Sequence, residues 1–95
     1  MAKYVCDFDK VSNTIKKLNN YKDNISKSIK KYNEEIDNIT SGYQGTARDI
    51  MIQKINMNIE NMKKIIENIN NIINHIEKSS KKIYEAEEKL SSLKI

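Results

Sequence analysis

Only two strong helix breakers occur in this 95-residue chain, Gly42 and Gly45, and proline is absent. Proline interrupts a helix because it lacks a backbone N–H, and glycine does so through its conformational freedom. The sequence on either side of the glycine pair can therefore continue as helix. This distribution predicts two long helices joined by one turn at about residues 42–46, in a single domain that spans residues 1–95.

The first segment is predicted to be a helix from about residue 9 to about residue 41. Its apolar residues recur at alternating steps of three and four, which places them along one side of a helix. Lys22 is the polar exception, and it either packs its stem while its ammonium reaches water or selects the register or partner. Asp9 or Ser12 is expected to cap the helix start. The apolar series is Phe8, Val11, Ile15, Leu18, Ile25, Ile29, Tyr32, Ile36 and Ile39.

The second segment is predicted to be a helix from about residue 47 to about residue 93. Thr46 and Asp49 are spaced like a capping box that would satisfy backbone groups at its start. One apolar seam comprises Ile52, Ile55, Ile59, Met62, Ile66, Ile69, Ile73 and Ile76. A second row, at intervals of seven and interrupted by Asn58 and Ser79, comprises Met51, Ile65, Ile72, Ala86 and Leu93. This helix therefore presents a wider apolar surface than the first.

The difference between the two helices predicts a partner. One antiparallel helix covers one seam, so the second row would face water in an isolated hairpin. Burying an isoleucine side chain contributes about 1.5–3 kcal/mol relative to leaving it exposed. The expected fold is therefore an all-α antiparallel two-helix hairpin that pairs into a four-helix-bundle dimer. A longer coiled coil would use the same seams.

A turn centred near Tyr43 and Gln44 predicts the register of the hairpin. Ile15 is then expected to face Ile73, and Phe8 to face Ser80. The second helix continues past that point, and its seam loses its isoleucines there. A C-terminal tail is therefore predicted to project from about residue 82.

Several function classes are disfavoured by composition. Cys6 is the only cysteine and His75 the only histidine. The chain therefore has too few cysteines for a disulfide framework, and a single histidine disfavours a His-paired metal site or a catalytic triad. We expect no enzymatic activity and no cofactor. The longest apolar run is Ile50-Met51-Ile52, too short to span a membrane. The N-terminal sequence MAKYVCDFDK lacks the apolar core of a cleavable secretory signal.

The predicted turn carries an aromatic residue, any residue and then glycine, as Tyr43-Gln44-Gly45. Ala47 and Met51 follow on one face of the second helix. This pattern, with the length and the hairpin, resembles the WXG (ESAT-like) family of small type VII secretion substrates and partners. Tyrosine stands here where that family has tryptophan. A well-packed turn explains the same residues without a further role.

The resemblance extends to the C-terminal part of the chain. The family carries a Tyr-x-x-x-Asp/Glu signal there, and Tyr84 and Glu88 match that spacing. Residues four apart share a helix face, so an ordinary surface pair is the alternative. The resemblance implies that Tyr43 and Gly45 of one chain would approach Tyr84 and Glu88 of a second.

The resemblance implies a bacterial protein made in the cytoplasm, exported through a type VII ATPase without a cleavable signal peptide. Its partner would be itself, a paralogous hairpin, or the helical N-terminal region of a larger secreted toxin. An intracellular coiled-coil adaptor would use the same seams. The net charge of +4 also allows a basic nucleic-acid binder, but scattered acids and a single arginine disfavour specific binding. Membrane contact is disfavoured because helix pairing would bury the apolar faces.

Overall fold

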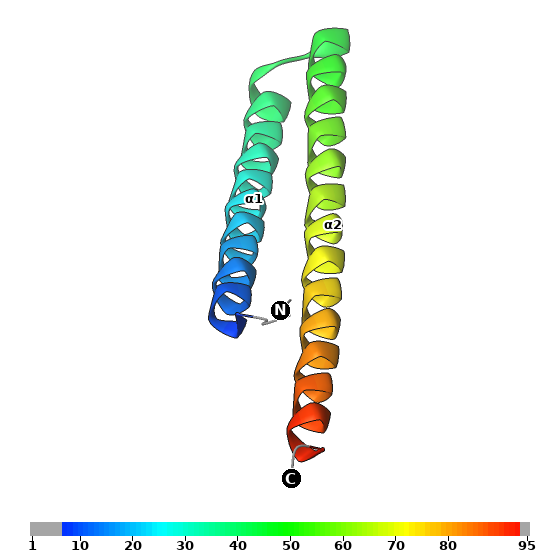
Figure 1. The fold of residues 1–95 in the computed structure, drawn as a ribbon. Coiled ribbons are helices and arrows are strands. Elements are labelled where there is room, and N and C mark those ends of the chain that lie inside the picture. The colour runs from blue at the N-terminus through cyan, green and yellow to red at the C-terminus, as the bar shows by residue number, and fades with distance from the viewer. Residues whose placement is uncertain (1–6, 94–95) are drawn as a thin grey trace.

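The computed structural model describes residues 7–93, and Cys6 lies outside this range. Within it the chain forms two helices, α1 (Phe8–Gly42) and α2 (Gly45–Ser92), which run antiparallel side by side (Figure 1). The prediction of an all-α antiparallel hairpin is confirmed. The molecule measures 77 × 20 × 16 Å, so it is a rod. Neither helix holds a stretch that is long and apolar enough to cross a membrane, as far as residues 7–93 extend.

The helix starts differ from the caps expected from the sequence. Asp7, not Asp9 or Ser12, caps α1, because its Oδ1 accepts from the backbone N–H groups of Asp9 and Lys10, both at 3.1 Å. At α2, Gln44 occupies the capping position and, within residues 7–93, its side chain makes no capping hydrogen bond. The capping box of Thr46 and Asp49 does not form, since Thr46 is already helical and a cap residue needs extended backbone geometry.

The turn is shorter than residues 42–46. Tyr43 and Gln44 are extended, with ψ of 156° in both, and the N–H of Tyr43 donates to the carbonyl of Ile39 at 2.9 Å. Gly45 follows with φ of +76°. A residue with a Cβ is disfavoured in this left-handed region, so the turn requires glycine at position 45.

The apolar seam lies between the helices and is thin. Its most buried side chains are Ile39, Ile59, Ile69 and Ile73. The flanking seam residues are half-buried: Ile15, Leu18, Ile25, Ile29, Ile55, Met62, Ile66 and Ile76. A single layer of contact between two helices cannot enclose side chains on all sides, so this core is small for 95 residues.

The register differs from the expected one by about one helical turn. Phe8 was expected opposite Ser80, but its ring lies 5.8 Å from that of Tyr84. The cause is the turn, because each of the two extended residues advances about 3.3 Å. A helical residue advances about 1.5 Å, so the two residues cover about the length of one helical turn. The start of α2 therefore lies beyond the end of α1 (Figure 1).

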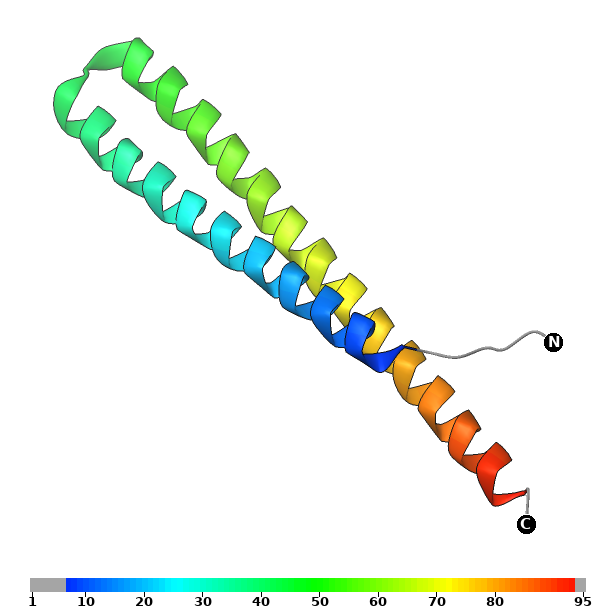
Figure 2. The same cartoon turned by 60° about the vertical axis from the view of Figure 1, so that its left-hand side comes forward.

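This shift also moves the start of the projecting tail. Tyr84 lies beside the first residue of α1, so the part of α2 without α1 beside it begins at about residue 85, not 82. Figure 2 shows α2 continuing as helix past the start of α1. Residues 85–92 extend about 12 Å at the helical rise. We call residues 84–92 the tail.

Candidate functional site

Tyr84 and Glu88 lie one turn apart at the base of the tail, on a surface open to solvent. The Tyr84 side chain is 51% exposed. Hydrogen bonding to the Glu88 carboxylate, and then the negative charge of that group, raise the pKa of the Tyr84 hydroxyl. The helix therefore brings these two groups together as a pair, and the pair is accessible to another protein.

Phe8 makes a second contact with Tyr84, from the other helix. The two rings meet edge to face, with a centroid separation of 5.8 Å and an interplanar angle of 75°. This is a favourable arrangement because the positive edge of one ring meets the negative face of the other. The sequence predicts Phe8 in the seam but one turn away from Tyr84. The contact depends on the extended conformation of the turn residues, for which the sequence carries no clear pattern.

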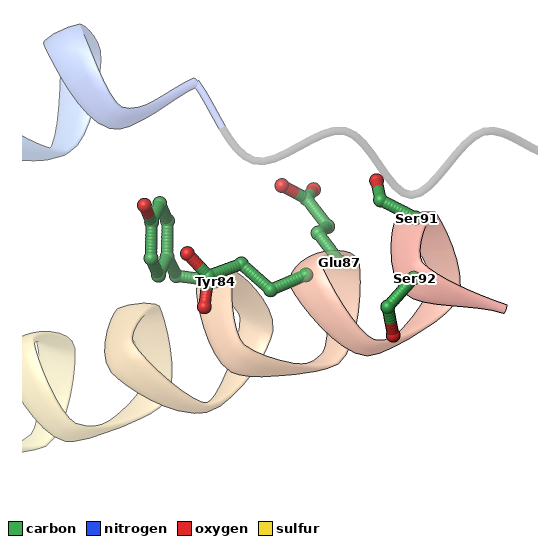
Figure 3. Close-up of a pocket in the computed structure, with 5 residues that line it drawn as sticks. Tyr84, Glu87, Ser91 and Ser92 are labelled. Atoms are coloured by element: carbon green, nitrogen blue, oxygen red, sulfur yellow. The ribbon is translucent and has the colours of Figure 1, made fainter.

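Much of the remaining tail surface is polar and acidic, although Leu90 is 61% exposed on it. A shallow groove along α2 is lined by Tyr84, Glu87, Glu88, Ser91 and Ser92 (Figure 3). Glu85 and Lys89 line a second groove that shares Glu88 and Ser92. Ion pairs within residues 7–93 join Arg48 to Asp49 and Lys63 to Glu60, so the tail carboxylates take part in neither. The tail therefore offers carboxylates and hydroxyls to solvent.

The turn motif lies at the opposite end of the rod. Tyr43 is 51% exposed, and Gln44 and Gly45 are exposed beside it. The molecule is 77 Å long, and the turn and the tail occupy its two ends (Figure 1). One chain therefore does not bring Tyr43 and Tyr84 together.

An apolar row on α2 lies outside the seam. Ile65 and Ile72, members of the second apolar row for which the sequence predicts a partner in the dimer core, are 47% and 48% exposed. Ile50 and Met57 are also exposed, although they belong to neither apolar row predicted from the sequence. Their spacing of seven residues is the sequence pattern that places them on one face of α2. We call Ile50, Met57, Ile65 and Ile72 the outer row.

Groups suited to metal binding or acid–base chemistry are sparse. Within residues 7–93, no cluster of three or more His, Cys, Asp or Glu side chains is placed to hold a metal ion. His75 is exposed on α2. The two motif regions and the outer row are therefore the candidate sites, and all three are surfaces suited to another protein.

A comparison with protein families finds a match over most of the chain. The family of proteins of 100 residues with WXG, WXG100, matches residues 3–88. That range includes the turn motif, the outer row and both residues of the Tyr84–Glu88 pair. Searches of curated proteins and of solved structures found no match.

Proposed function

Because the chain belongs to the WXG100 family, a family of small helical proteins of type VII secretion systems, we propose that it is exported as a dimer through its C-terminal tail. The observation that carries this proposal is the exposed Tyr84–Glu88 pair at the base of the tail. The spacing fits the Tyr-x-x-x-Asp/Glu signal, and the two groups interact on one helix face. The nearby carboxylates, which form no ion pair within residues 7–93, suit a basic surface on the export ATPase.

The outer row supports the proposal of a dimer. The chain exposes 7974 Å², whereas a compact protein of its mass exposes roughly 5,700 Å². The excess includes apolar side chains that a second hairpin would cover. We propose Ile65 and Ile72 as the centre of that interface, in a four-helix bundle. Family members typically form such dimers with themselves or with paralogues.

An antiparallel arrangement of two hairpins would also explain the separation of the motifs. Each rod carries its turn at one end and its tail at the other, so two antiparallel rods place Tyr43 of one beside Tyr84 of its partner. The export machine would then read a surface made by both chains. The second hairpin is a copy of this chain, a paralogue, or the helical N-terminal region of a larger secreted toxin.

Export from the native host tests the proposed function. The amount of protein in the medium is compared for the wild type, Tyr84→Ala, Glu88→Ala and Glu85→Ala, with a cytosolic protein as a lysis control. Glu85 is the matched control, because it loses the same charge from an adjacent exposed position that is not one turn from Tyr84. We expect Tyr84→Ala and Glu88→Ala to be retained in cells and Glu85→Ala to be exported.

Retention of the wild type would contradict the proposal and favour an intracellular coiled-coil adaptor. Export of all three variants at the wild-type level would show that the protein leaves the cell without the Tyr84–Glu88 pair. A paralogue or a toxin as the partner would be identified by co-purification with the wild type.

A further inference from the structure

We propose that Phe8 is a positioning residue for the export motif, so that presentation of Tyr84 depends on a folded hairpin. This inference rests on the proposed role of Tyr84 in export. Phe8 lies at the start of α1, far from the motif in sequence, and its ring meets Tyr84 edge to face at 5.8 Å. The contact links the first residue of one helix to the base of the tail on the other.

The neighbours of Tyr84 explain why it needs a positioning contact. Its side chain is half exposed, and an exposed tyrosine on a helix exchanges between rotamers on a nanosecond timescale. The Glu88 carboxylate, one turn away on the same helix, raises the pKa of the Tyr84 hydroxyl, and this interaction depends on the tail helix alone. The Phe8 ring restrains the aromatic ring from α1. Phe8 therefore adds a restraint that exists only while α1 packs against α2.

Phe8 is itself held by the way in which α1 begins. Asp7 caps the helix through hydrogen bonds to the N–H groups of Asp9 and Lys10, which fixes the backbone on both sides of Phe8. The Phe8 side chain is half-buried at the end of the apolar seam. A loss of register by one turn would separate the two rings. The Phe8–Tyr84 contact therefore reports both the packing and the register of the hairpin.

The consequence is a fold-dependent export motif. A receptor that binds Tyr84 in the orientation set by Phe8 would select folded hairpins over chains that are helical only in the tail. Edge-to-face aromatic pairs contribute enough to change the occupied rotamer population by roughly two- to tenfold. An effect of the same size is expected on export when the Phe8 ring is removed.

The experiment compares the exported fraction of Phe8→Ala, Phe8→Leu, Phe8→Tyr and Val11→Ala in the native host. Val11 is the matched control, because it is the next half-buried seam residue of α1. We expect about two- to tenfold less export for Phe8→Ala and Phe8→Leu, and near wild-type export for Phe8→Tyr and Val11→Ala. Phe8→Leu keeps the seam apolar, so it separates the loss of the aromatic contact from a loss of folding.

Two further readouts distinguish positioning from stability. In the purified variants, NMR signals of the Tyr84 ring should lose the ring-current shift from Phe8, while circular dichroism shows unchanged helix content. Phe8→Leu and Val11→Ala should also have similar melting temperatures. A melting temperature for Phe8→Leu well below that for Val11→Ala would show that Phe8 acts through folding and would overturn the inference.

The same set separates failure of this inference from failure of the proposed function. Normal export of Tyr84→Ala would show that Tyr84 is not part of an export motif, which would overturn the proposed function. Retention of Tyr84→Ala together with equal export of Phe8→Leu and Val11→Ala would overturn only the positioning role. Increased export of Phe8→Ala would also overturn it, because Phe8 would then mask Tyr84.

Discussion

The ammonium of Lys22 donates a hydrogen bond to the side-chain oxygen of Asn70, with Nζ and Oδ1 2.6 Å apart. Lys22 is half-buried at a seam position of α1 that is otherwise occupied by apolar residues. The aliphatic stem of Lys22 packs in the seam, while its ammonium extends to the edge of the seam and bonds to Asn70 on α2. Lys22 therefore combines apolar packing with a polar contact. This bond joins the helices in the same register as the Phe8–Tyr84 contact.

Replacing Lys22 with isoleucine is expected to stabilise the hairpin. The substitution adds a β-branched apolar side chain at the seam and removes a charge from a half-buried position, which favours folding by about 1 kcal/mol. The melting temperature, followed by circular dichroism, should rise by about 4–8 °C. Asn70→Ala removes the acceptor alone, and it should lower stability by less than about 1 kcal/mol because the ammonium can reach water. A lower melting temperature for Lys22→Ile would show that the polar contact outweighs the apolar one.

Ile69→Asp is expected to unfold the hairpin. The Ile69 side chain is 8% exposed, so the carboxylate would be placed between the helices among apolar side chains. The loss of apolar burial and the desolvation of the charge together cost at least about 3 kcal/mol. Helix content measured by circular dichroism should fall steeply. A fully helical Ile69→Asp protein would contradict the observed seam.

Ile72→Asp is expected to separate dimer formation from hairpin folding. It lies three residues from Ile69 but belongs to the outer row, so a single hairpin leaves the new carboxylate in water. In the proposed dimer the same carboxylate would enter the apolar interface. Sedimentation should therefore show a smaller species, with helix content reduced less than in Ile69→Asp. A dimer of unchanged affinity would place the interface on another face.

Gly45→Ala is expected to destabilise the turn, whereas Gly42→Ala is not. A Cβ at either position would meet no described atom within 4 Å, so sterics with neighbours do not separate them. The two positions differ in backbone conformation. Gly45 has φ of +76°, and an alanine in that conformation costs about 1–2 kcal/mol. Gly42 ends α1 with ordinary φ, and alanine there should gain up to about 1 kcal/mol through helix propensity. Urea denaturation of both variants measures the difference, and equal stabilities would contradict the left-handed conformation.

The helices were predictable from the sequence because their causes are local. The absence of proline and the steps of three and four specify where helix can form and which side is apolar. The register was not predictable in the same way, since it depends on whether Tyr43 and Gln44 are extended or helical. Because both residues are extended, Phe8 contacts Tyr84 and does not lie opposite Ser80, and the tail begins later in the sequence. The capping role of Asp7 was not predicted, because Asp7, Asp9 and Ser12 all carry side-chain oxygens that can accept hydrogen bonds at a helix start.

The candidate site was predictable to a similar degree. The Tyr84–Glu88 pair follows from helical spacing, which depends on one helix alone. The contact from Phe8 depends on both helices and on the turn, so the sequence gives it no separate pattern. The exposure of Ile65 and Ile72 follows from the second apolar row, although the surface that would cover them belongs to another chain.

The pKa of Tyr84 provides a test of the pair at the base of the tail. Hydrogen bonding to Glu88 and the charge of Glu88 hold this pKa above the ordinary value of 10.0, because both favour the neutral hydroxyl over the tyrosinate. The stabilisation from the pair is therefore complete below the ordinary pKa and is lost as the pH rises through the raised pKa. Glu88→Gln removes the charge, so the pKa of Tyr84 should fall toward the ordinary value. NMR titration of ring-labelled tyrosine measures this shift.

Glu85→Gln is the matched control for that titration. It removes the same charge from the residue next to Tyr84, but Glu85 is not among the groups that raise the pKa of Tyr84. The titration of Tyr84 should therefore be unchanged in this variant. Equal shifts in the two variants would show that the general negative charge of the tail, and not the Glu88 contact, sets the pKa. A specific effect of Glu88 would show that the pair forms in solution, where an export receptor would meet it.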